Sequence, residues 1–337
     1  MSERTIRLHT FCSVKGGVGK TSLAIACAKI LAAQGRVPVL IDCDLTGTSL
    51  ADGLDLRAPK AKLHEDGSID LEAEPTGNDL YTVAESRRMR ARRRFALQTD
   101  EKWKDHPHPP PFFNDPLNFA YANKRAPRID GMIWRHERND GVLYLPSSST
   151  YDDMTQSLEW FFGEAFDFAR AFAINLDALA KQIPSLTDVV VDLPPGIWGF
   201  PHYVLDLVSM LHYQDEEPLP EDYAVMRAGA IRWVPNPFLV TSRDPNDLVP
   251  ALEYIAMHQY RLPLLRPLVN RTIVGISAVR KVVEERLGPM VSLARLDEKM
   301  VVVDHLQPLA NIFVNGDVDI ALLPQSVLNV LRLGNPS

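Results

Sequence analysis

The stretch at residues 12–24 reads CSVKGGVGKTSLA, and it decides the fold of this chain. It stands between an apolar run, residues 6–14, and an alanine- and leucine-rich run with helical spacing, residues 20–34. These runs predict a strand, a loop and a helix that Gly35 ends. The loop glycines let successive backbone N–H groups point at one anion, and the positive end of the helix adds to the attraction. The stretch therefore predicts a phosphate-binding loop.

Further apolar runs predict the rest of the sheet. Residues 37–43 follow the helix, so the chain opens as strand, loop, helix and parallel strand. Runs of Val, Ile and Leu without polar alternation are typical of strands that are covered on both faces. The pattern predicts an α/β fold with a doubly wound, mostly parallel sheet and helices on both faces. The later strand candidates are residues 141–146, 188–194, 237–242 and 268–275.

Residues 57–140 interrupt this alternation. They contain acidic and polar loops, the stretch SRRMRARRRF at 86–95 and the stretch DHPHPPPFFNDP at 105–116. We expect proline to exclude long regular elements here, whereas the aromatic content is too high for a simple disordered linker. We expect residues 1–337 to form a single domain, with 57–140 as a large irregular insertion that binds a partner or DNA.

The composition limits the compartment and the partners. The 337 residues are 46% hydrophobic, enough to bury a sizeable core, and carry a formal net charge of -7, so contact with nucleic acid would need a local basic patch. Three cysteines without a C-x-x-C pair are typical of a reducing compartment and argue against a disulfide framework. The charged N-terminus and the lack of a long apolar segment predict a cytoplasmic protein without a membrane span.

The loop departs from the usual phosphate-loop pattern in one respect. That pattern is G-x-x-x-x-G-K-[ST], and Val14 stands where its first glycine belongs, while Gly19, Lys20 and Thr21 complete its end. Lys20 would contact the β and γ phosphates of a nucleotide, and the hydroxyl of Thr21 would bind Mg²⁺, which prefers oxygen ligands. A second lysine, Lys15, precedes the one that such loops need.

The stretch KGGVGKT at 15–21 resembles the deviant Walker A motif of the MinD/ParA family of P-loop ATPases. The resemblance covers residues 5–56 and 141–330, and it implies a P-loop ATPase domain that binds ATP and Mg²⁺. It also implies a homodimer that sandwiches two ATP molecules, in which Lys15 reaches the phosphates bound by the partner subunit and neutralises charge during γ-phosphoryl transfer. The residues that it assigns to the nucleotide are Gly16, Gly17, Val18, Gly19, Lys20, Thr21 and Ser22.

Polar residues after the apolar runs complete the expected site. Asp42 and Asp44 follow the second strand at the sheet edge where ligands bind, and we expect Asp42 near the metal. The resemblance implies that Asp44 helps to position the attacking water. Asp192 ends an apolar strand, as a Walker B carboxylate that approaches Mg²⁺ through water must, and the turn at 194–196 can respond to the γ phosphate. The resemblance implies that Asn270 binds the adenine amino group, although a turn-forming asparagine is also compatible with the sequence.

The resemblance implies an ATP-driven dimerising switch that hydrolyses ATP slowly to position, partition or regulate a macromolecule, with a protein partner that stimulates hydrolysis. The lack of paired cysteines argues against a metal-cluster carrier. The C-terminal PQSVLNVLRLGNPS predicts a packed last helix, because it lacks the basic and aromatic residues of a membrane-binding one. A different class also remains open, an ATP-dependent small-molecule or metal-handling enzyme of the dethiobiotin-synthetase or metallochaperone kind. Stimulation by DNA or protein would favour the switch, and stimulation by a small carboxylate or a metal would favour the enzyme.

Two basic clusters are candidates for non-specific DNA binding, which would depend steeply on salt. A solvated helix face or a contact with an acidic partner explains such a run equally well. His106 and His108 lack a third ligand at a diagnostic spacing, so a surface or docking loop is preferred there over a metal site. The clusters comprise Arg87, Arg88, Arg90, Arg92, Arg93 and Arg94, followed by Arg280, Lys281 and Arg286.

Overall fold

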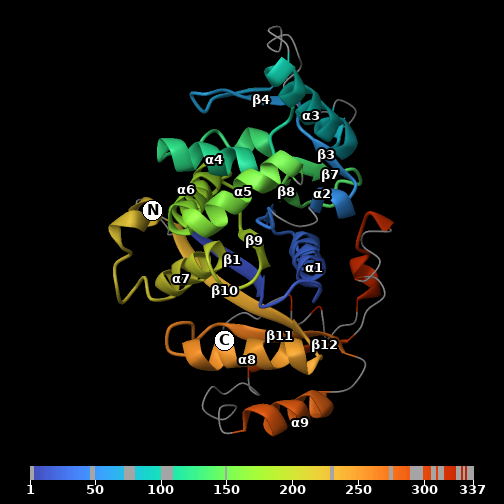
Figure 1. The fold of residues 1–337 in the computed structure, drawn as a ribbon, viewed down its shortest axis with the longest axis vertical. Helices are drawn as coiled ribbons and strands as arrows, with labels where there is room; N and C mark the ends of the chain where they lie inside the picture. Colours follow the sequence, from blue (N-terminus) through green and yellow to red (C-terminus); the bar gives the residue numbers. More distant parts are fainter. Residues whose placement is uncertain are drawn as a thin grey trace.

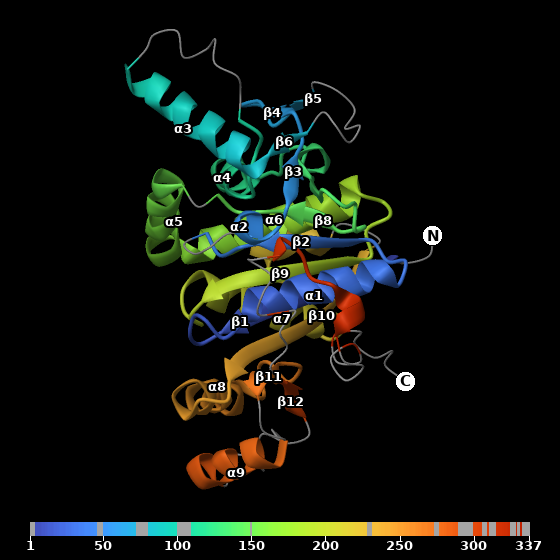
Figure 2. The same ribbon diagram turned by 90° about the vertical axis from the view of Figure 1, so that its right-hand side faces the viewer.

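The computed structural model describes residues 4–45, 50–71, 80–99, 109–148, 150–227, 231–272, 276–288, 299–304, 309, 315–323, 328 and 331. Within these ranges the chain forms a ten-stranded sheet of order β12-β11-β10-β1-β9-β2-β8-β7-β3-β6 (Figures 1 and 2). All pairs from β12 to β8 are parallel. The predicted α/β sheet is confirmed. Its parallel strands are β1 (Arg4–Ser13), β2 (Pro38–Asp42), β8 (Leu143–Leu145), β9 (Asp188–Pro195), β10 (Ile231–Ser242), β11 (Arg266–Thr272) and β12 (Val301–Asp304).

Helices cover both faces of the sheet, which explains the unbroken apolar runs. On one face α1 (Lys20–Ala33) packs on β1, β9 and β2, while α6 (Ala165–Gln182) and α7 (Phe200–His212) lie on the other (Figure 1). Val190 of β9 belongs to the core on the α1 side, whereas Val189 and Val191 belong to the core on the opposite side. From Asp188 to Pro194, the residues of β9 are therefore buried whichever way they point. Further helical elements among the described residues are α2 (Leu50–Gly53), α5 (Tyr151–Gly163), α8 (Pro245–His258), α9 (Ile276–Leu287), η2 (Asp130–Met132), η3 (Glu221–Arg227) and η4 (Ile320–Leu322).

The strand β10 begins at Ile231, earlier than the predicted start at residue 237. It contains Pro235 and Pro237, which break the apolar run that serves as the sequence signal. Pairing with β11 begins only at Phe238, so both prolines precede the doubly paired part of the strand. Tertiary pairing with β1 extends the strand beyond what its composition predicts.

Residues 57–140 hold more regular structure than the sequence predicts. The arginine-rich stretch lies in the 17-residue helix α3 (Val83–Thr99), so the expectation that proline excludes long elements is wrong. The reason is local: residues 76–106 contain no proline, and arginine is a strong helix former. The other elements of this part are β3 (Leu56–Ala58), β6 (Tyr81–Thr82) and β7 (Trp134–His136), which extend the central sheet in antiparallel fashion, the hairpin β4 (Ala61–Leu63) and β5 (Ile69–Leu71), and α4 (Asn114–Asn123).

Two sequence expectations fall largely on residues that the structure does not describe. The predicted last helix at 324–337 lies outside the described residues except for Leu328 and Leu331, and His106 and His108 also lie outside them. Among the helices that are described, none combines the length and the apolar character needed to cross a bilayer.

Candidate functional site

The loop between β1 and α1 has the backbone of an anion-binding site. Gly17 and Gly19 have φ angles of 78° and 86°, in the left-handed region that side chains disfavour, so glycine is required at both positions. Gly19 precedes α1 directly, and its cap makes no side-chain hydrogen bond. The first turn of α1 also contains no acidic residue. The first turn of α1 therefore does not itself neutralise the positive end of the helix, which can attract an anion.

A buried lysine and aspartate lie at this end of the sheet. The ammonium of Lys20, the first residue of α1, forms an ion pair with Oδ1 of Asp192 on β9, and both side chains are buried. Burial disfavours the charge of Lys20, but Asp192, Asp44 and Asp42 together raise its pKa. The second oxygen of Asp192, Oδ2, is buried and has no hydrogen-bond partner within the described part of the chain. A buried carboxylate oxygen without a donor is costly, so it fits a site for Mg²⁺ or a water bound to it.

The second carboxylate, Asp42, lies directly beside Asp192. The two residues are register partners on the neighbouring strands β2 and β9. Asp42 accepts hydrogen bonds from the backbone N–H groups of Asp44 (3.0 Å) and Leu50 (2.9 Å), and its Oδ2 accepts one from Oγ of Ser147 (2.6 Å). Burial and then the nearby charge of Asp192 raise the pKa of Asp42 to about 7. A cation bound between these carboxylates would relieve their repulsion.

The remaining residues predicted for the phosphates and the metal lie close by. Thr21 and Ser22 follow Lys20 in the first turn of α1, where Thr21 is half-buried and Ser22 is buried. Asp44 raises the pKa of both Lys20 and Asp42, so its charge acts on the same site. The structure thus brings the loop, Thr21 and the three aspartates to one edge of the sheet. Sequence reasoning missed Ser147, whose only signal is its place directly after an apolar strand.

A family model described as the CobQ/CobB/MinD/ParA nucleotide-binding domain (CbiA) matches residues 9–303. The chain belongs to this family. The match spans the phosphate loop, both carboxylate-bearing strands and the whole of residues 57–140. The resemblance to the MinD/ParA family that the loop motif indicates is thereby confirmed.

Solved structures with a similar fold include a protein described as a plasmid partition protein of Borrelia burgdorferi B31, bound to AMPPNP. It has 14% identity and a TM-score of 0.50, and the match covers 97% of this chain and 96% of that one. A ParA family ATPase from Chlorobium tepidum TLS has 12% identity over 98% and 93% of the chains, with a TM-score of 0.49. The cell division ATPase MinD of Pyrococcus furiosus has 14% identity over 97% and 96%, with a TM-score of 0.48. At such identities the likeness concerns the fold alone. No curated protein matches this chain.

Two residues of this ParA/MinD-type protein make contacts that the phosphate-loop motif does not predict. The ammonium of Lys15 is half-exposed and donates to the carbonyl of Asn246 at 2.7 Å, and it lies 3.4 Å from the carboxylate of Asp247 at the start of α8. Asn270 is buried at the end of β11 and donates from its side-chain amide to the carbonyl of Val18 at 2.9 Å. Lys15 thus contacts the start of α8, while Asn270 fastens the loop to β11, which β10 separates from β1 in the sheet.

The turn after β9 packs directly against the phosphate loop. The N–H of Gly196 donates to the carbonyl of Ser13 at 2.8 Å, and the ring of Pro195 lies 3.9 Å from the position that a side chain at Gly16 would take. Trp198, in the same turn, is 62% exposed. A shift of either segment must therefore move the other, which suits a turn that responds to bound phosphate.

The arginine run does not present one basic surface. Arg90 is buried, and its guanidinium bonds to Asp115 at 2.7 and 2.8 Å and to Asp153 at 2.7 Å. Arg87 pairs with Asp52. The sequence treats six arginines as equivalent, but the structure uses at least Arg90 as an internal ion-pair partner. The exposed members among the described side chains are Arg88 and Arg92 on α3 and Arg280, Lys281 and Arg286 on α9.

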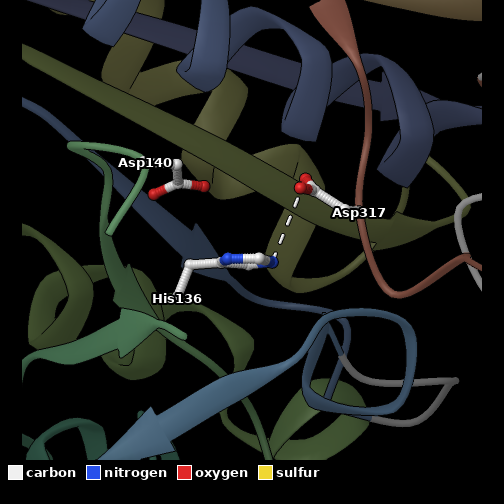
Figure 3. A group of neighbouring side chains, drawn as sticks. All are labelled: His136, Asp140 and Asp317. Carbon is white, nitrogen blue, oxygen red and sulfur yellow. Dashed lines mark ion pairs between the residues drawn. The ribbon is translucent and has the colours of Figure 1, made fainter. Parts of the chain in front are cut away.

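A second cluster, His136, Asp140 and Asp317, has ligand atoms that lie within 4.8 Å of one another (Figure 3). Lys29 of α1 contacts both carboxylates, at 2.7 Å from Asp140. The backbone N–H of Arg138 donates to Nδ1 of His136, so Nε2 carries the proton and donates to the carbonyl of Gly316 at 3.1 Å. Because both ring nitrogens and both acids are already engaged, the cluster is an ion-pair network that holds residues 315–323 against α1 and is not a metal site.

Proposed function

We propose that this protein is an ATPase that binds ATP with Mg²⁺, dimerises in that state and hydrolyses the nucleotide slowly. We further propose that this cycle acts as a switch that positions, partitions or regulates a macromolecular partner. The observation that carries the proposal is the Lys20–Asp192 ion pair at the start of α1, beside a carboxylate oxygen to which none of the described residues donates. Membership of a family of nucleotide-binding domains supports it.

The ion pair suggests how the site accepts its ligand. Incoming phosphates compete with Asp192 for the ammonium of Lys20, while the loop N–H groups from Gly16 to Ser22 hold their oxygens. Asp192 is then free to face the metal together with Asp42 and the hydroxyl of Thr21. When bound there, Mg²⁺ would neutralise charge on the phosphate oxygens.

Hydrolysis needs an oriented water and extra positive charge. In our proposal Asp44, whose charge acts on Lys20 and Asp42, orients the attacking water, and Lys15 supplies the charge to the phosphates bound by the partner subunit. Lys15 is half-exposed, and its contacts with described residues lie at the surface, at the start of α8, so little energy opposes their loss. Asn270 would use its carbonyl oxygen on the adenine amino group, because its N–H already binds Val18.

The partner is proposed to be a protein that stimulates hydrolysis, together with DNA bound without sequence preference through the exposed basic residues of α3 and α9. A cytoplasmic location is also proposed, since Cys12, Cys27 and Cys43 are all buried free thiols.

The alternative is a small-molecule enzyme, and a cavity in the structure could hold its substrate. The position of that cavity argues against this alternative. A cavity of about 880 Å³ lies in the insertion, lined among others by Lys62, His64, Arg93 and Asp115. None of its described lining residues belongs to the phosphate loop or to the carboxylates of the site. A molecule bound there would not meet the γ phosphate, so the cavity does not support phosphoryl transfer to a small substrate.

Light scattering tests the proposal. The mass of the protein is measured with ADP, with ATP and as Asp44→Ala with ATP, each with and without duplex DNA at two salt concentrations. We expect a dimer with ATP only, a persistent dimer for Asp44→Ala, and DNA binding that weakens at the higher salt. Normal ATP hydrolysis by Asp44→Ala would refute the role of Asp44, and a mass that ignores the nucleotide would refute the switch.

A further inference from the structure

Hydrogen bonds on either side of the peptide link between Ser147 and Ser148 connect the nucleotide site to the insertion. It begins at Asp42, whose Oδ2 accepts from Oγ of Ser147 at 2.6 Å and from its backbone N–H at 3.3 Å. Ser147 and its neighbour Ser148 follow β8 directly, and both are fully buried. The position of the Asp42 carboxylate therefore depends on where these two serines are held.

The next links hold Ser148. Its hydroxyl donates to Asp153 in the first turn of α5, and its N–H donates to Oδ1 of Asn114 at 2.7 Å. Thr150 donates to the same Asp153 oxygen at 2.6 Å. Asp153 is buried, so its charge has to be matched from another element.

The positive charge that balances Asp153 comes from α3, the arginine-rich helix of the insertion. Arg90 of α3 binds Asp153 through Nε at 2.7 Å and Asp115 of α4 through both terminal nitrogens. The guanidinium thus ties the α5 start and the α4 start to one point on α3. Two further bonds hold the same junction: Phe112 N–H donates to Asp115 at 2.8 Å, and Phe113 N–H donates to the carbonyl of Pro146 at 2.8 Å.

We propose that Arg90, Asp153 and Ser148 are positioning residues for the nucleotide site: they fix Ser147, and through it Asp42, in the geometry that the metal needs. The effect on Mg²⁺ and ATP rests on the proposed function. The contacts that lead from Arg90 to Asp42, which we call the relay, belong to the folded chain itself. It gives the insertion a physical connection to Asp42, so that a displacement of α3 changes how the site holds Mg²⁺-ATP.

The first test measures the Mg²⁺ concentration that gives half-maximal ATP hydrolysis. Ser147→Ala removes the direct bond and should raise that concentration about tenfold, as the loss of one buried bond implies. Arg90→Lys keeps the charge but loses the bidentate fork, and should raise it about threefold. The double variant should show less than the product of the two effects, since both act through one path. Arg128→Lys is the matched control, an insertion arginine paired with Asp130 at the surface, and should change nothing.

A second test needs no nucleotide. The N–H groups of Asp44 and Leu50 bind the Asp42 carboxylate, so their hydrogen exchange reports how firmly it is held. Arg90→Lys should accelerate exchange at both amides, and Arg128→Lys should not. Unchanged exchange at Asp44 and Leu50 in a folded Arg90→Lys variant would overturn the relay, as would independent effects in the double variant. A wild-type protein that fails to bind ATP would instead refute the proposed function, and the exchange experiment would still decide the relay.

Discussion

The phosphate loop and the insertion hold buried charge in opposite ways. At the loop, Lys20 contacts one oxygen of Asp192, while the other oxygen of that carboxylate has no donor among the described residues. In the insertion, the Arg90 guanidinium makes four hydrogen bonds to Asp115 and Asp153. Incomplete pairing in a buried site is expected where a ligand completes the set, whereas saturated pairing is expected where the charge serves the fold. The contrast assigns binding to the first group and architecture to the second.

The largest effect should follow from Lys20→Ala. Because the ammonium is the cation that the phosphates need, ATP affinity should fall by more than about a hundredfold, as the loss of a buried charged contact implies. Lys29 offers a matched control: it is equally buried on the same helix, but it pairs with Asp140 and Asp317. Calorimetric titration with ATP should show binding for Lys29→Ala and none for Lys20→Ala. Equal losses in the two variants would break the distinction between binding and structural lysines.

The next effect concerns stability. Arg90→Ala leaves Asp115 and Asp153 without their cation, and should lower the free energy of unfolding by about 3–5 kcal/mol, as for other broken buried pairs. Urea denaturation of the nucleotide-free protein measures this. Arg90→Lys, which keeps the charge, should recover part of the loss. A loss below about 1 kcal/mol for Arg90→Ala would show that the ion pairs of Arg90 do not stabilise the fold.

The contributions of two buried carboxylates, Asp42 and Asp153, to the free energy of unfolding should change with pH in opposite directions. Burial, with Asp192 and Asp44, raises the pKa of Asp42 to about 7, so between about pH 4 and 7 folding takes up a proton there. The contribution of Asp42 to stability should therefore fall as the pH rises through this window, by up to about 1.4 kcal/mol per unit. Burial also acts on Asp153, but Arg90 outweighs it and lowers the pKa, so its contribution is lost as the pH falls towards and below about 4.

The test compares the free energy of unfolding of Asp42→Asn and of Asp153→Asn with that of the wild type, from pH 3 to 8 and without nucleotide. The change of each difference with pH is the slope that the two carboxylates predict. The stability of Asp42→Asn relative to the wild type should rise as the pH rises to 7. The stability of Asp153→Asn relative to the wild type should fall as the pH rises towards about 4, and the difference should stay constant at higher pH. Slopes of the same sign would contradict the assignment of the two carboxylates to different kinds of site.

The same contrast explains what the sequence could predict. The loop depends on glycines, a lysine and strand ends that lie within a few residues of one another, so residues 12–24 and the aspartates after two apolar strands locate the candidate site. The insertion depends on contacts between distant residues: Arg90 meets Asp153 across 63 positions. No local pattern distinguishes this arginine from Arg88 or Arg92, so the run looked uniform. Ser147 was missed for the same reason, since only its contact with Asp42, 105 positions away, reveals it.

The smallest effects should come from Arg88→Gln and Arg92→Gln, the exposed arginines of α3. Each should change the free energy of unfolding by less than about 0.5 kcal/mol, because neither side chain is buried. If these residues contact DNA phosphates, each substitution should lower the salt dependence of DNA binding, measured as the slope of log affinity against log salt concentration, by about one. Anisotropy titrations of labelled duplex DNA at four salt concentrations measure the slope, with Arg128→Gln as an exposed arginine outside α3. A stability loss as large as that of Arg90→Ala would show that the whole run is structural, and an unchanged slope would remove α3 from the DNA-binding proposal.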